Sequence, residues 1–137
     1  NHENYDDMST LRVDRIAHIT VLSERRKPLR EIKGYNQQRT FNVSQYVKEH
    51  IYMFGGESIT VSFKAKRSIV NQILDWFDGN VEFTNITADN VVCRVRVNHD
   101  AFKYWALQYM QSVKVLTPAS LVTEVKAAIE EGLRQYS

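Results

Sequence analysis

The segment ITVSFK, residues 59–64, alternates apolar and polar side chains, and NVVCRVRV, residues 90–97, repeats this alternation. A period of two residues is typical of a β-strand with one buried and one exposed face. Residues 81–86 and 113–116 predict two further strands. Two stretches with apolar residues at helical spacing lie between these strands, so the expected order is strand, helix, strand, strand, helix, strand.

Each of the two connecting helices is expected to bury one face. The first should end at Asp78-Gly79-Asn80, and the second should begin at the capping residue Asn98. Their apolar positions are Ile69, Val70, Ile73, Leu74 and Phe77 in the first helix, and Phe102, Trp105, Ala106 and Tyr109 in the second. This order is typical of an α+β, ferredoxin-like βαββαβ fold, in which both helices cover one face of a four-stranded antiparallel sheet.

Two more helices are expected outside this unit. One begins after the capping residue Asn42, and an additional C-terminal helix has Thr117 as its cap and Pro118 in its first position. The buried face of the C-terminal helix is expected to carry Leu121, Val125, Ala128, Ile129, Leu133 and Tyr136. We therefore expect the ferredoxin-like domain to span residues 41–137.

The first forty residues differ from this domain. Residues 12–22 are rich in β-branched side chains and predict a strand. Residues 24–40 predict a basic linker, since residues 11–40 hold eight basic and three acidic side chains, a balance of +5. A lone strand is not stable in water, so its partners are expected upstream of Asn1 or on another chain. Residues 1–23 are thus interpreted as the end of a truncated β domain.

The composition of the chain excludes several kinds of site and of cellular location. The net charge is only +2, and the single cysteine, Cys93, excludes a disulfide within one chain and a cysteine-rich zinc site. No segment approaches the roughly 20 apolar residues of a membrane span. The N-terminus, Asn1-His2-Glu3, does not resemble a signal peptide. We expect a cytoplasmic protein.

Successive side chains of a strand point to opposite faces of the sheet, and this alternation predicts a basic surface on the face that the helices leave open. Lys64 of the first strand and Arg94 and Arg96 of the third should converge there, because the first and third strands are central neighbours in this fold. Lys114 should lie on the same side, with Glu82 as the opposing charge. Arginines two residues apart can bind successive phosphates or a carboxylate. The alternative is an ordinary solvated sheet face.

The types of side chain on this open face also limit which ligands it could bind. These strands carry no outward aromatic side chain, so stacking of bases is not expected and any nucleic acid would be bound mainly through its phosphates.

Catalytic and metal-binding motifs are missing from the sequence. The four histidines are scattered without metal-ligand spacing, and there is no phosphate-binding loop, dinucleotide fingerprint or nucleophile elbow. Cys93 shares the parity of buried valines and is expected to be a core residue rather than a nucleophile. Trp105 is likewise expected in the core rather than in a ligand box. We expect no enzymatic activity, no metal and no cofactor.

Several short motifs resemble the WYL-domain family of bacterial transcription regulators. They are Tyr5-Asp6-Asp7, Leu11-Arg12-Val13-Asp14-Arg15-Ile16, Phe54-Gly55-Gly56-Glu57, Trp105 to Tyr109, and Val113-Lys114-Val115-Leu116-Thr117-Pro118 with Leu121. The first two are similar to the end of the Sm-like WYL domain, and the others to the C-terminal extension of that family. The family has a glycine where this chain has Met110, so the second connecting helix must end here without one.

The resemblance implies a regulator with an N-terminal winged helix-turn-helix that binds DNA, a central WYL domain and this extension. Such proteins are usually dimers, and their C-terminal half is associated with ligand sensing, in several cases of nucleic acid. Arg12 and Arg15 match basic positions on the ligand-facing surface of the family. Alternatively, Asp14 and Arg15 form a structural ion pair.

Together these observations predict the ligand-sensing and dimerisation region of a transcription regulator, expected to form a homodimer. The candidate ligand-binding residues are Arg12, Arg15, Lys64, Arg94 and Arg96, and the expected ligand is anionic, such as single-stranded nucleic acid. Two alternatives remain open. One is a regulatory module for a small-molecule effector, and the other is a pure dimerisation domain whose sheet charges pair across the interface.

Overall fold

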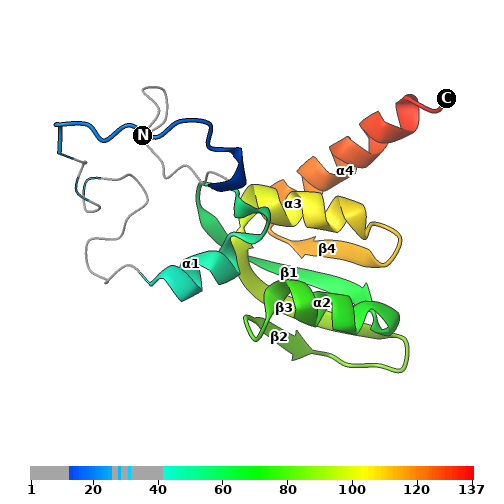
Figure 1. The fold of residues 1–137 in the computed structure, drawn as a ribbon. Helices are drawn as coiled ribbons and strands as arrows, with labels where there is room; N and C mark the ends of the chain where they lie inside the picture. Colours follow the sequence, from blue (N-terminus) through cyan, green and yellow to red (C-terminus); the bar gives the residue numbers. More distant parts are fainter. Residues whose placement is uncertain (1–12, 26–27, 29–30, 32–41) are drawn as a thin grey trace.

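The computed structural model describes residues 13–25, 28, 31 and 42–137 (Figure 1). The strands are Ser58–Lys66 (β1), Val81–Thr84 (β2), Asn90–Asn98 (β3) and Val113–Thr117 (β4). The α-helices are Val43–Glu49 (α1), Val70–Phe77 (α2), His99–Gln108 (α3) and Ala119–Arg134 (α4). Short 3-10 turns are Val13–Arg15 (η1), Ile51–Met53 (η3) and Arg67–Ile69 (η4).

The four strands form one antiparallel sheet in the order β2-β3-β1-β4. The helices α2 and α3 lie on one face of this sheet, and α4 follows β4 at its edge (Figure 1). The longest pairing joins β1 to β3 from Ser58 opposite Asn98 to Lys66 opposite Asn90. The ferredoxin-like βαββαβ fold with an additional C-terminal helix is therefore confirmed.

An aromatic cluster fills the space between the sheet and its helices. The ring of Phe63 on β1 lies 5.2 Å from that of Phe102 and 5.3 Å from that of Trp105, measured between centroids. Phe77 of α2 closes the cluster at 4.9 Å from Trp105. All four side chains are fully buried, and Cys93 is buried beside them on β3. The core assignments of Trp105 and Cys93 are confirmed.

The helix boundaries follow from local chemistry. The side chain of Asn98 accepts a hydrogen bond from the backbone N–H of Ala101, and that of Asn42 accepts one from Gln45. At the end of α2 the chain turns through Asp78 and Gly79, both with positive φ. The predicted helix caps at Asn98 and Asn42 and the predicted helix end at Asp78-Gly79 are thus confirmed.

The end of α3 forms without a glycine, as the sequence predicts. Tyr109 ends this helix, and Met110 follows without a left-handed backbone conformation. The backbone N–H groups of Ser112 and Val113 both bond to the carbonyl of Tyr109, which closes the turn into β4. No glycine is needed because the turn uses ordinary φ values.

The strand predicted over residues 12–22 is wrong for residues 13–22. Val13–Arg15 form a 3-10 turn, and residues 16–22 have irregular backbone. A strand needs a neighbour to satisfy its backbone N–H and C=O groups, and no described strand pairs with this segment. Arg12 and most of the linker predicted over residues 24–40 lie outside the described residues.

Two details of α4 were also predicted wrongly. Thr117 ends β4, and Pro118 occupies the N-cap position without a side-chain hydrogen bond. Only the first half of the helix packs on the domain, since Leu121 and Val125 are buried whereas Leu133 is 68% exposed. Ile129 and Tyr136 are exposed as well. The second half projects beyond the sheet, and the apolar spacing alone gave no sign of where the sheet would end (Figure 1).

The aromatic cluster predicts a strong contrast between two substitutions. Phe63→Ala should lower the free energy of unfolding by about 3–5 kcal/mol, because it opens a cavity among three rings. Leu133→Ala on the exposed half of α4 should change it by no more than about 0.5 kcal/mol. Urea denaturation of both variants measures the difference, and equal effects would contradict this account of the core.

Candidate functional site

The open face of the sheet carries a row of cations from three strands. The pairing register sets Arg94 opposite Ser62 and Arg96 opposite Thr60 on β1, and it sets Lys64 opposite Lys114 on β4. All four cationic side chains are exposed. We term this surface, with Lys66 at the end of β1, the basic sheet face. The structure thus brings together the three predicted sheet residues and Lys114.

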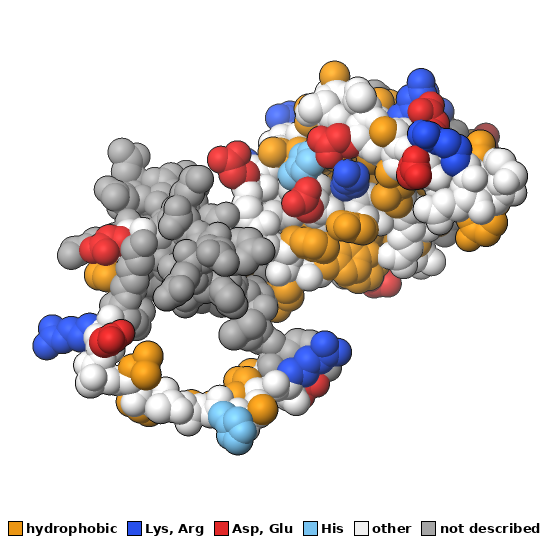
Figure 2. Space-filling view, turned by 90° about the horizontal axis from the view of Figure 1, so that it is seen from above, with side chains coloured by type: hydrophobic (Ala, Val, Ile, Leu, Met, Phe, Trp, Pro, Cys, Tyr) orange, Lys and Arg blue, Asp and Glu red, His pale blue; other side chains and the backbone are white. Residues whose placement is uncertain are grey.

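The alternation of the strands dictates this arrangement. Val61, Phe63 and Ala65 on β1 are buried under the helices, so the side chains between them must point to the other side. On β3, the buried positions Cys93 and Val95 flank Arg94 in the same way. By contrast, the side that carries α3 and α4 shows intermingled acidic, basic and hydrophobic side chains (Figure 2).

Arg96 has a partner that the sequence did not indicate. Its Nε lies 3.4 Å from a carboxylate oxygen of Glu49, at the end of α1. The Glu49 side chain is 13% exposed and that of Arg96 is 56% exposed, so the acid lies beneath the arginine. Gln45, one turn earlier in α1, donates a hydrogen bond of 2.6 Å to the same oxygen. One of the predicted anion-binding groups is therefore already held by an internal carboxylate.

A buried polar cluster attaches α1 to the domain. His50 directly follows α1 and is 6% exposed; its ring is stacked on Tyr46 at a centroid distance of 3.9 Å. Its ring nitrogens face the carbonyl oxygens of Tyr46 at 2.9 Å and Gly56 at 3.2 Å. Asn98 donates to the carbonyl of Gly55 at 2.9 Å. The turn at Gly55-Gly56 is thus fixed from both sides, which positions Glu49.

The next segment of the chain strengthens this attachment. Tyr52 and Met53 in η3 both have φ of 59°, a left-handed conformation that bulky residues rarely adopt. The Tyr52 hydroxyl donates a 2.6 Å hydrogen bond to Gln108 of α3, and its ring lies 4.6 Å from that of Trp76 on α2. Contacts with both helices hold this strained backbone in place.

The other cations of the basic sheet face are less compensated. Arg94 lies directly opposite Glu82 of β2, but no ion pair within 4.0 Å joins them. Lys64 and Lys114 lie opposite each other, and within the described ranges neither makes an ion pair. Positive charge on this face is therefore concentrated near β1 and β4.

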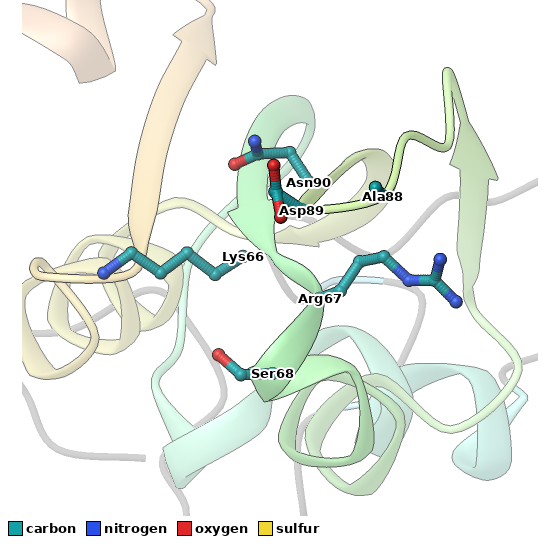
Figure 3. A pocket seen from close by; sticks show the side chains of 6 residues that line it. All are labelled: Lys66, Arg67, Ser68, Ala88, Asp89 and Asn90. Carbon is teal, nitrogen blue, oxygen red and sulfur yellow. The ribbon is translucent and has the colours of Figure 1, made fainter.

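A shallow hollow lies where β1 ends, beside the turn between β2 and β3 (Figure 3). It encloses about 390 Å³ and is lined by Lys66, Arg67, Ser68, Ala88, Asp89 and Asn90. Lys66 extends toward β4, whereas Arg67 points the opposite way and donates to the carbonyl of Thr87. The backbone N–H of Arg67 also bonds to the carbonyl of Asp89, so the hollow is part of the framework that joins β1 to the β2–β3 turn.

Of the two N-terminal candidates, only Arg15 lies within the described residues, and it is not joined to this face by a described ion pair. Arg15 lies in η1 and is exposed. Arg12 lies outside the described residues. Lys66 and Glu49 were missed as members of the site. Lys66 shares the parity of Lys64 and could have been found from the sequence, whereas Glu49 reaches the sheet only through the packing of α1.

The other reactive groups among the described residues do not form an arranged site. Burial raises the pKa of the Cys93 thiol to about 11, so it stays protonated at neutral pH. Over residues 13–25, 28, 31 and 42–137, no three His, Cys, Asp or Glu side chains cluster as metal ligands. In the same ranges, no helix has both the length and the apolar character to cross a bilayer.

The fold and the face define a ferredoxin-like α+β domain with a basic open sheet. Comparison with known families matches residues 55–133 to the WCX domain. This match covers more than half of the chain, which therefore belongs to the WCX domain family, and it is consistent with a C-terminal region associated with WYL domains. A comparison with curated proteins gave no match. The helix α1 precedes the matched residues.

The contact between Glu49 and Arg96 is expected to be weak, because the arginine is largely exposed. A double-mutant cycle with Glu49→Gln and Arg96→Gln should give a coupling energy of about 0.2–1 kcal/mol. The exposed pair Lys126 and Glu130 on α4, 3.7 Å apart, serves as the matched control, with about 0.3–0.5 kcal/mol expected. A coupling above about 2 kcal/mol would mean that an anion could not readily displace Glu49.

Proposed function

We propose that this chain is the C-terminal ligand-sensing and dimerisation region of a WYL-type bacterial transcription regulator. It binds an anionic ligand, such as single-stranded nucleic acid, through the basic sheet face and has no enzymatic activity. The observation that carries the proposal is the strand register, which gathers Lys64, Arg94, Arg96 and Lys114 on one exposed surface. Membership of the WCX domain family supports the assignment to a regulator.

The chemistry of the face favours phosphate contacts over base contacts. The outward positions on the central strands are Thr60, Ser62, Lys64, Val92, Arg94 and Arg96. Without a ring on which a base could stack, the ligand is held by ionic contacts to its backbone. Arginine and lysine suit this task because their donors match phosphate oxygens.

The proposed mechanism couples ligand binding to DNA binding elsewhere in a dimeric regulator. A ligand on the sheet also engages Arg12 and Arg15 of the N-terminal segment and so biases the position of that segment relative to the domain. The DNA-binding heads of a winged helix-turn-helix dimer then change their spacing.

Two observations favour the alternative functions. The hollow beside Lys66 has a volume suited to a small polar effector, which favours a small-molecule module. The exposed apolar residues Ile129 and Leu133 on α4, with Tyr136 just after the helix, favour a dimerisation surface. The steepness of the salt dependence separates the first alternative from the main proposal, since a small effector in this hollow meets fewer cations than a strand of phosphates along the sheet and so releases fewer counterions.

The proposal predicts salt-dependent binding of short single-stranded DNA, measured by fluorescence anisotropy. Arg94→Ala combined with Arg96→Ala should weaken binding by about threefold to tenfold and reduce the slope of log K against log salt by about 1.4. The control is Lys126→Ala combined with Arg134→Ala on α4, which removes the same charge away from the sheet. No binding by the parent chain at low salt, or equal losses in both double variants, would contradict the proposal.

Neutralising Glu49 tests the same proposal through an expected gain in DNA affinity. Glu49→Gln should tighten DNA binding by about threefold, because it removes a negative charge 3.4 Å from Arg96 while keeping the side-chain shape. Glu130→Gln on α4 is the matched control and should leave the affinity unchanged. Unchanged or weaker binding by Glu49→Gln would show that the ligand does not approach Arg96.

A further inference from the structure

The closest cationic pair on the open sheet consists of two lysines. Lys64 of β1 and Lys114 of β4 occupy directly opposite positions in the antiparallel pairing, and both are exposed. In such a pair the Cβ atoms are about 4.5–5.5 Å apart, and like charges placed this way destabilise a sheet. The sheet therefore places two cationic side chains at directly opposite positions, at a cost in stability.

Among the described residues, no acidic side chain forms an ion pair with either lysine. Glu82 is on the far edge strand, two strands from β1 and three from β4, or about 10 and 14 Å at the usual strand spacing. Glu49 lies by Arg96, four residues along β3 from the position opposite Lys64, or about 13 Å. Each separation exceeds the Debye length of about 8 Å at physiological salt.

A third lysine extends the cationic pair. Lys66 follows Lys64 on the same face of β1, and its side chain reaches toward β4 (Figure 3). Asp89 is the acidic residue nearest to it in the lining of the hollow, yet its carboxylate makes no ion pair within 4.0 Å with any described side chain. Three lysines thus occupy neighbouring positions on one part of the sheet, and each ammonium group carries three hydrogen-bond donors.

We propose that Lys64 and Lys114, flanked by Lys66, form the primary subsite of the sheet for a phosphate-type oxyanion. The inference rests on the proposed function and deepens it by locating the first anionic contact. Of the two arginines, Arg96 is held by Glu49 and Arg94 lies opposite Glu82, so an anion arriving at either one meets a carboxylate. At Lys64 and Lys114 no described acidic side chain lies directly opposite or forms an ion pair, and an anion bound there removes the repulsion between the two lysines.

Thermal unfolding of the 137-residue chain tests the subsite with inorganic phosphate as the probe, at constant ionic strength against chloride. Lys114→Gln should raise the Tm in dilute chloride by about 2 °C, because it relieves the like-charge pair. It should also remove at least half of the phosphate-dependent rise in Tm of the parent chain. Lys126→Gln is the matched control and should retain the full rise. An undiminished phosphate effect in Lys114→Gln would overturn the proposal.

Short single-stranded DNA then separates this inference from the proposed function. The combined Lys64→Gln and Lys114→Gln variant should lose more than about tenfold in affinity, and thus more than the combined arginine variant. If phosphate stabilises the parent chain through the lysines but DNA does not bind, the subsite stands and the nucleic-acid function fails. If DNA binds and the lysine variant binds it equally well, the subsite fails and the function stands. If neither phosphate nor DNA binds, the subsite and the nucleic-acid function both fail. Both also fail if the lysine substitutions change only the oligomeric state and not the binding of either probe.

Discussion

The antiparallel pairing of β1 with β3 is the constraint on which the rest of the domain depends. Its register puts Phe63 and Cys93 under the helices and Lys64 and Arg94 on the open side. A slip of one residue would reverse both faces, burying charges against the aromatic cluster and exposing the core. The cost of burying even one unpaired ion is so large that the register cannot slip. The hydrophobic core and the basic sheet face are therefore two consequences of one alignment.

Most of the domain could be predicted because its signals are local. Alternation identified the strands, and Asn98 and the Asp78-Gly79 stop marked helix ends through interactions within a few residues. Features that depend on distant packing could not be predicted. Nothing in the sequence near Glu49 indicates that it meets Arg96, and the apolar residues of α4 do not reveal which of them the sheet can cover. The strand expected over residues 12–22 failed for a related reason: β-branched residues favour an extended chain, but only a partner strand makes it a sheet.

Asn98 shows how closely the site is tied to the fold. Its side-chain oxygen caps α3, its side-chain nitrogen binds the carbonyl of Gly55, and its backbone pairs with Ser58 at the start of β1. The segment that carries α1 is thus held by a residue that also ends β3. The carboxylate of Glu49 consequently sits at a fixed place relative to Arg96, and the electrostatic balance of the sheet is set partly by a helix outside the βαββαβ unit.

The junction between β4 and α4 has a mechanical consequence. Only Pro118 separates the last residue of β4 from the first residue of α4, so the base of the helix is tied directly to the end of the strand. A helix of 16 residues is about 24 Å long, and a rotation of about 5° at its base moves its far end by about 2 Å. Lys114 lies on β4, three residues before this junction, and Leu133 and Tyr136 lie near the free end of α4. Because Leu121 and Val125 anchor only the first half of α4, any small tilt of this helix would be magnified at its exposed apolar end.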